Sequence, residues 1–154
     1  MKLSKNFSLA EMTKSQTAIR KGIKNEPSTE HVENLIHLAK TVLQPIRDEF
    51  GRPVVISSGY RSPELCEAIG SSSKSQHAKG EAADFEIPGV DNMQLATWIS
   101  KNTIFDQLIL EYYEPGDPNS GWVHCSAVKE GSRAQVLKAS KVEGKTKYEN
   151  ILLV

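Results

Sequence analysis

Cysteine is scarce in this chain, since Cys66 and Cys125 are the only two among 154 residues. Two cysteines are too few for the disulfide framework that stabilises many small secreted domains. The two lie in segments with different sequence patterns, and a free cysteine is commonly buried as a small apolar side chain. We therefore expect two free, buried thiols.

Long hydrophobic runs are also missing. No stretch approaches the roughly 20 apolar residues that an α-helix needs to cross a bilayer. The segment Met1–Phe7 contains no apolar run of the kind found in a secretory signal peptide. These absences predict a protein that does not insert into membranes. They also predict synthesis in the cytosol, with any export using another route.

Neither sign of charge dominates the composition. Lys and Arg together number 19, as do Asp and Glu, and the formal net charge is zero. A nucleic-acid-binding domain normally shows a basic excess or a basic patch, so we expect a partner that is small or only locally charged, and no nucleic acid. The length suits one domain with its own core, and no repeat or long linker divides the chain. We predict a single domain over residues 1–154.

Apolar periodicity and capping residues predict several helices. The strongest covers residues 29–50, where apolar side chains recur at steps of three and four, with Gly51 at its end and Pro45 bending its last turn. A shorter helix begins after Ser8, which can form a capping box with Glu11. Two further helices follow the N-cap residues Ser62 and Asp91 and cover residues 63–69 and 92–102.

Strands are predicted between and after these helices. Residues 53–58 are rich in β-formers, residues 82–87, 105–113 and 122–127 alternate with a period of two, and residues 135–153 resemble a hairpin around Glu143-Gly144. Helices thus precede and interrupt strands that are joined partly by short loops. This order predicts an α+β fold with a mainly antiparallel sheet flanked by helices.

Two histidines and an aspartate, His77, Asp84 and His124, are the candidate metal ligands. Two imidazoles and a carboxylate leave one position of a tetrahedral zinc ion open, as catalytic sites do. The strand alternation places Asp84, Glu111 and His124 each among apolar neighbours on a different strand, where a carboxylate is costly unless it is paired or bound to metal. The patterns alone leave two interpretations open, a metal site on the sheet face and scattered surface polarity.

The spacing of these residues belongs to a longer set of motifs: Ser75-x-His77-x-x-Gly80-x-Ala82-x-Asp84, Trp122-x-His124, Ser58-Gly59-Tyr60-Arg61-Ser62-Pro63 and Phe105-Asp106-Gln107-Leu108-Ile109-Leu110-Glu111. Together they resemble the zinc D-alanyl-D-alanine carboxypeptidase and L-alanyl-D-glutamate endopeptidase family. Phage endolysins, van-type dipeptidases and the hedgehog signalling domain are its relatives. The resemblance covers nearly the whole chain and is closest to small single-domain members from phages and prophages.

The resemblance implies that His77, Asp84 and His124 bind one zinc ion. It also implies that Arg61 helps to bind substrate and that Ser75 belongs to the wall of the site. The planar guanidinium of Arg61 suits a peptide carboxylate or carbonyl, although a salt bridge that braces its own loop is an alternative. Ser75 can equally donate to substrate or cap its loop.

Three acidic residues are candidates for the catalytic base. Many relatives carry an acidic residue three positions before the last zinc histidine, where this chain has Gly121. We predict Glu111 as the base, because its strand face also carries Gln107 and its strand precedes that of His124. Glu114 and Asp117 are alternatives in a turn-rich loop, where acidic residues are usually solvated.

The cleft lining is less specified by sequence. Gln107 is a candidate substrate contact because alternation places it, with Ile109, on the face of Glu111, opposite Leu108, Leu110 and Tyr112. The aromatic candidates are Tyr60, Tyr112, Tyr113 and Trp122, for each of which core packing is the default interpretation. Among them, we predict that Tyr60 and Trp122 bind substrate.

The expected function is zinc-dependent hydrolysis of a peptide bond in peptidoglycan stem peptides. Both the terminal D-Ala-D-Ala bond and the internal L-Ala-D-Glu bond fit the resemblance. We expect a monomer that acts on the cell wall after another protein releases it, with substrate recognition in the cleft itself. Two alternatives remain open: a non-catalytic zinc-binding interaction module, motivated by Gly121, and a phage virion component.

Overall fold

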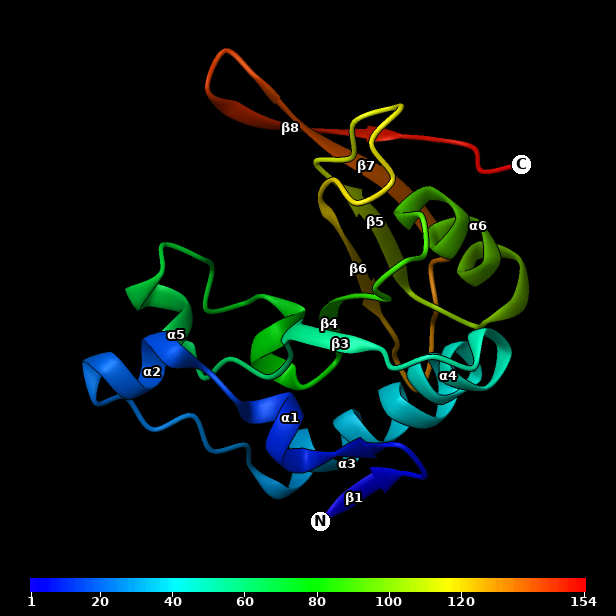
Figure 1. The fold of residues 1–154 in the computed structure, drawn as a ribbon. Helices are drawn as coiled ribbons and strands as arrows, with labels where there is room; N and C mark the ends of the chain where they lie inside the picture. The colour runs from blue at the N-terminus through cyan, green and yellow to red at the C-terminus, as the bar shows by residue number, and fades with distance from the viewer.

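The computed structural model describes residues 1–154 and is built around a six-stranded sheet (Figure 1). The strand order is β3-β4-β6-β5-β7-β8, and a separate small ribbon pairs β1 with β2 at the N-terminus. The strands are β1 (Lys2–Ser4), β2 (Phe7–Ser8), β3 (Val55–Ser58), β4 (Ala82–Glu86), β5 (Gln107–Glu111), β6 (Trp122–Ser126), β7 (Gln135–Val142) and β8 (Lys145–Asn150).

The sheet is antiparallel at every pairing except one. The neighbours β5 and β7 run parallel, whereas β3–β4, β4–β6, β6–β5 and β7–β8 are antiparallel. The strand β6 therefore lies between β4 and β5, although it follows both in the chain. The predicted α+β class with a mainly antiparallel sheet is confirmed.

Helices cover one face of the sheet and its ends. They are α1 (Leu9–Thr13), α2 (Gln16–Lys21), α3 (Thr29–Leu38), the π-helical turn η1 (Ala39–Leu43), α4 (Gln44–Phe50), α5 (Pro63–Ala68), the 3₁₀ turn η2 (Gln76–Lys79) and α6 (Asn92–Asn102). The predicted caps are all present: Ser8 and Glu11 form both bonds of a capping box, and the side chains of Ser62 and Asp91 accept from the first turns of α5 and α6.

The long helix predicted over residues 29–50 is interrupted rather than bent in its last turn. It runs as α3, then η1, then α4, and the left-handed Gly51 ends it. The second residue of α4 is Pro45, which has no amide hydrogen to donate to the preceding turn. The helix widens by one residue in that preceding turn, and π-type insertions are a common adjustment of this kind.

The two faces of the sheet have different environments. One face packs against α3, η1, α4 and α6 in a core of 23 buried residues that includes Phe85, Leu108, Leu110 and Val123. Cys66 and Cys125 are both free and buried, as expected. The opposite face carries Asp84, His124 and Glu111 and is not covered by these helices. The site therefore lies on the sheet face that the core leaves free.

The C-terminal segment forms the predicted hairpin, with its turn at Glu143-Gly144 between β7 and β8. In Figure 1 this hairpin projects beyond the body of the molecule, at the end of the sheet away from β3. None of the helices has the length and apolar content required to cross a membrane.

Candidate metal centre and active site

The three candidate ligands converge at one point on the sheet. Asp84 on β4 is the direct cross-strand partner of His124 on β6, and η2 carries His77 next to them. The Nδ1 atom of His124 lies 2.9 Å and the Nε2 atom of His77 lies 3.4 Å from the same Oδ1 atom of Asp84. All three donor atoms lie within 4.8 Å of one another. Residues separated by 47 positions in sequence are thus brought to one place by strand pairing and one short turn.

The turn that carries His77 is held at both ends. The Ser75 hydroxyl accepts from the His77 amide at 3.2 Å, and Gly80 ends the turn with φ +74°. A Cβ at Gly80 would press against the backbone of His31, so this position also depends on glycine for space. Ser75 therefore caps its loop, which was one of its two predicted roles, and it also lines the pocket.

The orientation of His77 is set by a backbone carbonyl. Its Nδ1 atom lies 2.7 Å from the carbonyl oxygen of Gly59. A carbonyl oxygen can only accept, so Nδ1 must carry the proton, and Nε2 is left with its lone pair toward Asp84. Metal-ligating histidines are commonly oriented in this way by a second hydrogen bond.

Ionisation in this cluster favours metal binding. Burial lowers the pKa of His77, which stabilises the neutral imidazole. Burial alone would raise the pKa of Asp84, but the adjacent His124 and His77 side chains outweigh it and hold that pKa well below its ordinary value. Neutral imidazoles and an ionised carboxylate are the forms that bind metal.

The two separations between Asp84 and the histidines fit a tetrahedral metal ion. Two donors that each lie about 2.0–2.1 Å from zinc at the tetrahedral angle are about 3.3 Å apart. The separations of 2.9 and 3.4 Å around Asp84 are close to this value. Two nitrogens and one carboxylate oxygen also form a donor set that zinc accepts. His77, Asp84 and His124 could therefore hold a metal ion with one position left for water or substrate.

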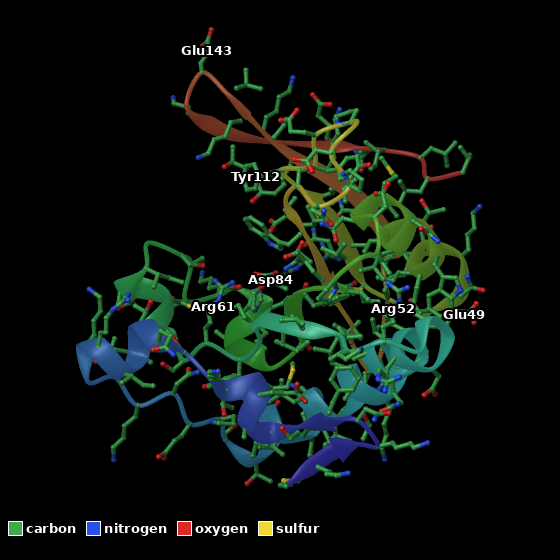
Figure 2. All side chains as sticks on the ribbon, in the orientation of Figure 1. Glu49, Arg52, Arg61, Asp84, Tyr112 and Glu143 are labelled. Carbon is green, nitrogen blue, oxygen red and sulfur yellow. The ribbon has the colours of Figure 1, made fainter.

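The three candidate ligands His77, Asp84 and His124 form what we call the metal group, and Arg61 contacts two of them directly. Its Nη2 atom lies 3.2 Å from Oδ2 of Asp84, its Nε donates to the Ser58 hydroxyl at 2.8 Å, and its backbone amide donates to the carbonyl of His77. Both predicted roles of Arg61 are thus compatible with its position. The salt bridge is made to a candidate ligand, and the same side chain lines the pocket (Figure 2).

The pocket beside the metal group has a volume of about 660 Å³. Four predicted residues line it besides the ligands and Arg61, namely Ser75, Gln107, Glu111 and Trp122. Glu114 and Asp117, the alternative bases, lie in a turn outside it. Six residues that were not predicted as site residues also line it: Ser71, Gln76, Ile109, Arg133, Leu137 and Tyr148. Ile109 could have been predicted to line the pocket, because strand alternation places it on the same face as Glu111. Nothing in the sequence pattern indicated Tyr148.

Glu111 ends β5 beside the metal group, as the prediction of a base requires. Its cross-strand partner is Trp122, two residues before His124. Burial and then the negative charge of Asp84 raise the pKa of Glu111 above its ordinary value. A carboxylate with a raised pKa is a better proton acceptor than one in water.

The structure also explains the glycine at position 121. Gly121 has φ +64°, and a Cβ on its backbone would overlap the carbonyl oxygen of Glu111. No side chain, acidic or otherwise, fits there without movement of the backbone. The position that carries an acid in many relatives is therefore sterically closed in this chain by the strand that ends in Glu111.

Two aromatic predictions need correction. Tyr60 does not line the pocket by the metal group; it is only 4% exposed and packs in the core with its ring 5.5 Å from that of His31. Its amide is bonded to Met12, which directs the residue inward. A polar motif predicts a loop near the site but not the direction of each side chain in it.

Strand alternation predicts Tyr112 on the sheet face opposite Glu111, but the structure places its ring on the same face as Glu111. Its backbone has φ +55°, so the alternation stops after Glu111. Its ring lies 5.3 Å from that of Trp122, and its hydroxyl is 2.6 Å from the hydroxyl of Thr146 on β8. Tyr112 therefore stands on the face of the metal group, and Figure 2 shows it on the same side of the sheet as Asp84.

Comparison with known proteins agrees with these features. A family model described as Peptidase M15 matches residues 5–126. No curated protein matches the chain. The matched segment contains the three metal-group residues together with Arg61 and Glu111, and it confirms the family resemblance of the motifs. The chain therefore belongs to the peptidase M15 family.

Proposed function

We propose that this protein is a zinc-dependent peptidase that hydrolyses a peptide bond in peptidoglycan stem peptides. Membership of the peptidase M15 family supports peptide hydrolysis and zinc dependence at the level of the family. The observation that carries the proposal is the convergence of two imidazoles and two carboxylates, those of Asp84 and Glu111, on one pocket. A zinc ion held by His77, Asp84 and His124 would polarise the scissile carbonyl and lower the pKa of water from 15.7 toward about 7.

The residues of the chain supply the rest of the chemistry. The Glu111 carboxylate accepts a proton from the attacking water and returns it to the leaving amine. General acid–base catalysis of this kind contributes roughly 10²–10⁴-fold in rate. Arg61 holds Asp84 and presents the remainder of its guanidinium to the substrate carbonyl or carboxylate. Gln107 and Trp122 contact the peptide from the pocket wall.

The Glu111→Gln variant tests the base. It keeps the size of the side chain but cannot accept a proton, so we expect cleavage of purified muropeptides to fall roughly 10²–10⁴-fold while zinc content is unchanged. Glu114→Gln is the matched control, because that residue lies outside the pocket, and it should cleave at the wild-type rate. In the wild type, cleavage should decline as the pH falls through the raised pKa of Glu111, because protonation removes the acceptor.

Two peptides separate the possible substrates. One ends in D-Ala-D-Ala and the other contains an internal L-Ala-D-Glu bond, and mass spectrometry of the products identifies the bond that is cleaved. Cleavage should stop with a chelator and return with added zinc. If the wild-type protein with zinc cleaves neither peptide nor intact muropeptides, the peptidase proposal is wrong. The non-catalytic zinc-binding module would then be the better interpretation.

A further inference from the structure

The C-terminal hairpin forms one side of the pocket. Strand pairing aligns Trp122 on β6, Glu111 on β5, Ala139 on β7 and Tyr148 on β8 in one row across the sheet. The next row runs from Asp84 and His124 to Ile109 and Leu137. Residues aligned in this way share a sheet face. The face of the metal group therefore continues without a break onto β7 and β8.

This part of the pocket differs in chemistry from the metal group. Ile109 and Leu137 form an apolar floor, at 6% and 8% exposure, and both line the pocket. Tyr148 stands at the edge of this floor and is 55% exposed, which is high for a large aromatic side chain in a sheet. Burial and then the charge of Glu111 raise the pKa of Tyr148, which is consistent with a phenol that faces the active-site carboxylates.

The hairpin is fixed to the rest of the site by hydrogen bonds. The Tyr112 and Thr146 hydroxyls lie 2.6 Å apart, and the Gln107 side chain donates to that of Gln135 at 2.8 Å. These two bonds attach β8 and the start of β7 to β5. Tyr148 is thus presented on a positioned strand, and a ligand that contacts it does not have to order a free loop.

The distance from the metal group matches a short peptide. Neighbouring strands are about 4.8 Å apart, so the two strand spacings from Glu111 to Tyr148 amount to about 10 Å. An extended chain covers about 3.3–3.6 Å per residue. A peptide that crosses the strands from the reactive position would therefore reach Tyr148 within about three residues.

We propose that Ile109, Leu137 and Tyr148 form a substrate subsite that takes the methyl group of an alanyl residue within about three positions of the scissile bond. The subsite rests on the proposed peptidase function and specifies its substrate side. The side chains of Ile109, Leu137 and Tyr148 carry no charge, so they suit an apolar group such as a methyl, and both candidate scissile bonds include an alanyl residue. Leu137 and Tyr148 lie outside the residues matched by the family model, so the subsite depends on this chain's own C-terminal segment.

Variants of Tyr148 test the subsite. Tyr148→Ala should raise KM for an alanine-containing stem peptide roughly fivefold to tenfold with little change in kcat, because it removes a binding contact but no reacting group. Tyr148→Phe should retain most of the affinity. Lys147→Ala is the matched control. Lys147 is adjacent to Tyr148 on β8, its side chain is 58% exposed and forms an ion pair with Glu149, and it does not line the pocket. Circular dichroism and thermal unfolding verify that all variants fold.

Glycine-substituted peptides connect the subsite to one alanine. Each alanine of the stem peptide is replaced in turn by glycine, and one replacement should reduce kcat/KM of the wild type roughly tenfold. The same replacement should have a much smaller effect on Tyr148→Ala, since the contact is already absent. Binding of the same peptides to the Glu111→Gln protein, measured by calorimetry, gives a second readout that needs no cleavage.

The outcomes separate the two proposals. If the wild type cleaves the peptide and Tyr148→Ala does so with unchanged KM and unchanged preference for alanine, the subsite is refuted while the peptidase function stands. If no cleavage occurs but binding weakens in Tyr148→Ala, Tyr148 is a peptide-binding contact, while the peptidase function and with it the role of this contact next to a scissile bond are wrong. Equal loss of binding in Lys147→Ala would also refute the subsite, because it would point to a general effect on the hairpin.

Discussion

At the scale of single residues, the Asp84 carboxylate is shared by three side chains. One of its oxygens faces both His124 and His77, and the other accepts from Arg61. A buried carboxylate is stable only when such partners compensate for the loss of water. The Arg61 contact leaves Oδ1 to the histidine side, where a metal would bind. Arg61 therefore orients a candidate metal ligand.

Position 121 requires glycine because the backbone of the neighbouring strand β5 lies against it. The Cα of Gly121 faces the carbonyl oxygen of Glu111, so the chain cannot have a side chain at 121 and the present course of β5 at the same time. A side chain of any kind, acidic ones included, is excluded at this position by steric overlap. Glu111 approaches the metal group from the strand that occupies that space.

We predict that Gly121→Asp destabilises the protein and does not supply a base. Steric overlap adds to the strain of a non-glycine residue at φ +64°, so the free energy of unfolding should fall by about 2 kcal/mol or more. Gly22→Asp is the control, with φ +65° and open space around its Cα, and should cost about 1 kcal/mol. Urea unfolding measures both. Restored cleavage in a Gly121→Asp, Glu111→Gln double variant would contradict our prediction that position 121 cannot supply a base.

At the scale of elements, Asp106 connects three segments around the pocket. It lies just before β5, is 3% exposed, and accepts from Arg133 through Nε at 3.0 Å and Nη2 at 2.8 Å. It also accepts from Gln76, the residue before His77, at 3.0 Å. One carboxylate thus ties the turn η2, which carries the candidate ligand His77, to β5 and to the connection that leads into β7.

We predict that this connection weakens in acid. The hydrogen-bonded Arg133 guanidinium lowers the pKa of Asp106 from its ordinary value of 3.8 to about 2. The stabilisation is therefore complete above about pH 4 and is lost as the pH falls toward about 2. Because Arg133 is half exposed, we expect only about 1–2 kcal/mol.

The comparison of wild type with Asp106→Asn measures this contribution. The difference in unfolding free energy between them should be largest at neutral pH and should shrink between about pH 4 and pH 2. Glu114→Gln, which changes an acid in an exposed turn, should show no such dependence. A difference between wild type and Asp106→Asn that stays constant over this range would show that ionisation of Asp106 contributes nothing.

At the scale of the whole molecule, the sheet separates stability from chemistry. One face is buried against the helices, and the other brings together the candidate metal ligands from η2, β4 and β6. These ligands come from distant parts of the chain, so the metal site exists only when the sheet has formed. A metal that binds the folded state and not the unfolded chain must therefore stabilise the whole domain.

We predict that zinc raises the unfolding temperature of the metal-free protein. A ligand at 100 times its Kd contributes about 2.7 kcal/mol, which corresponds to roughly 5–10 °C for a domain of this size. Differential scanning calorimetry with chelator and with zinc measures the shift. Glu111→Gln should retain it, whereas His124→Ala should lose most of it. An identical unfolding temperature with and without zinc in the wild type would be incompatible with a metal at this site.

Local sequence signals were sufficient for most elements and for naming the three residues that form a possible metal-binding group. The capping residues Ser8, Ser62 and Asp91 act where they were predicted, since a cap depends on atoms within a few residues. The alternation around Asp84 and His124 likewise placed both on one face. The predictions for Tyr60 and Tyr112 were wrong in direction, because a bond to Met12 and a positive φ at the end of β5 decide where those rings lie.

The sequence by itself determined the class of fold, the candidate donor set and the absence of an acid at position 121, because these follow from residue types and short spacings. Only the tertiary structure decided that β6 lies between β4 and β5, that the backbone of Glu111 fills the space beside Gly121, and that Tyr148 faces the pocket. Those facts depend on strand order and register, which join residues far apart in the chain. No local pattern contains that information, since each strand satisfies its own alternation in several possible orders.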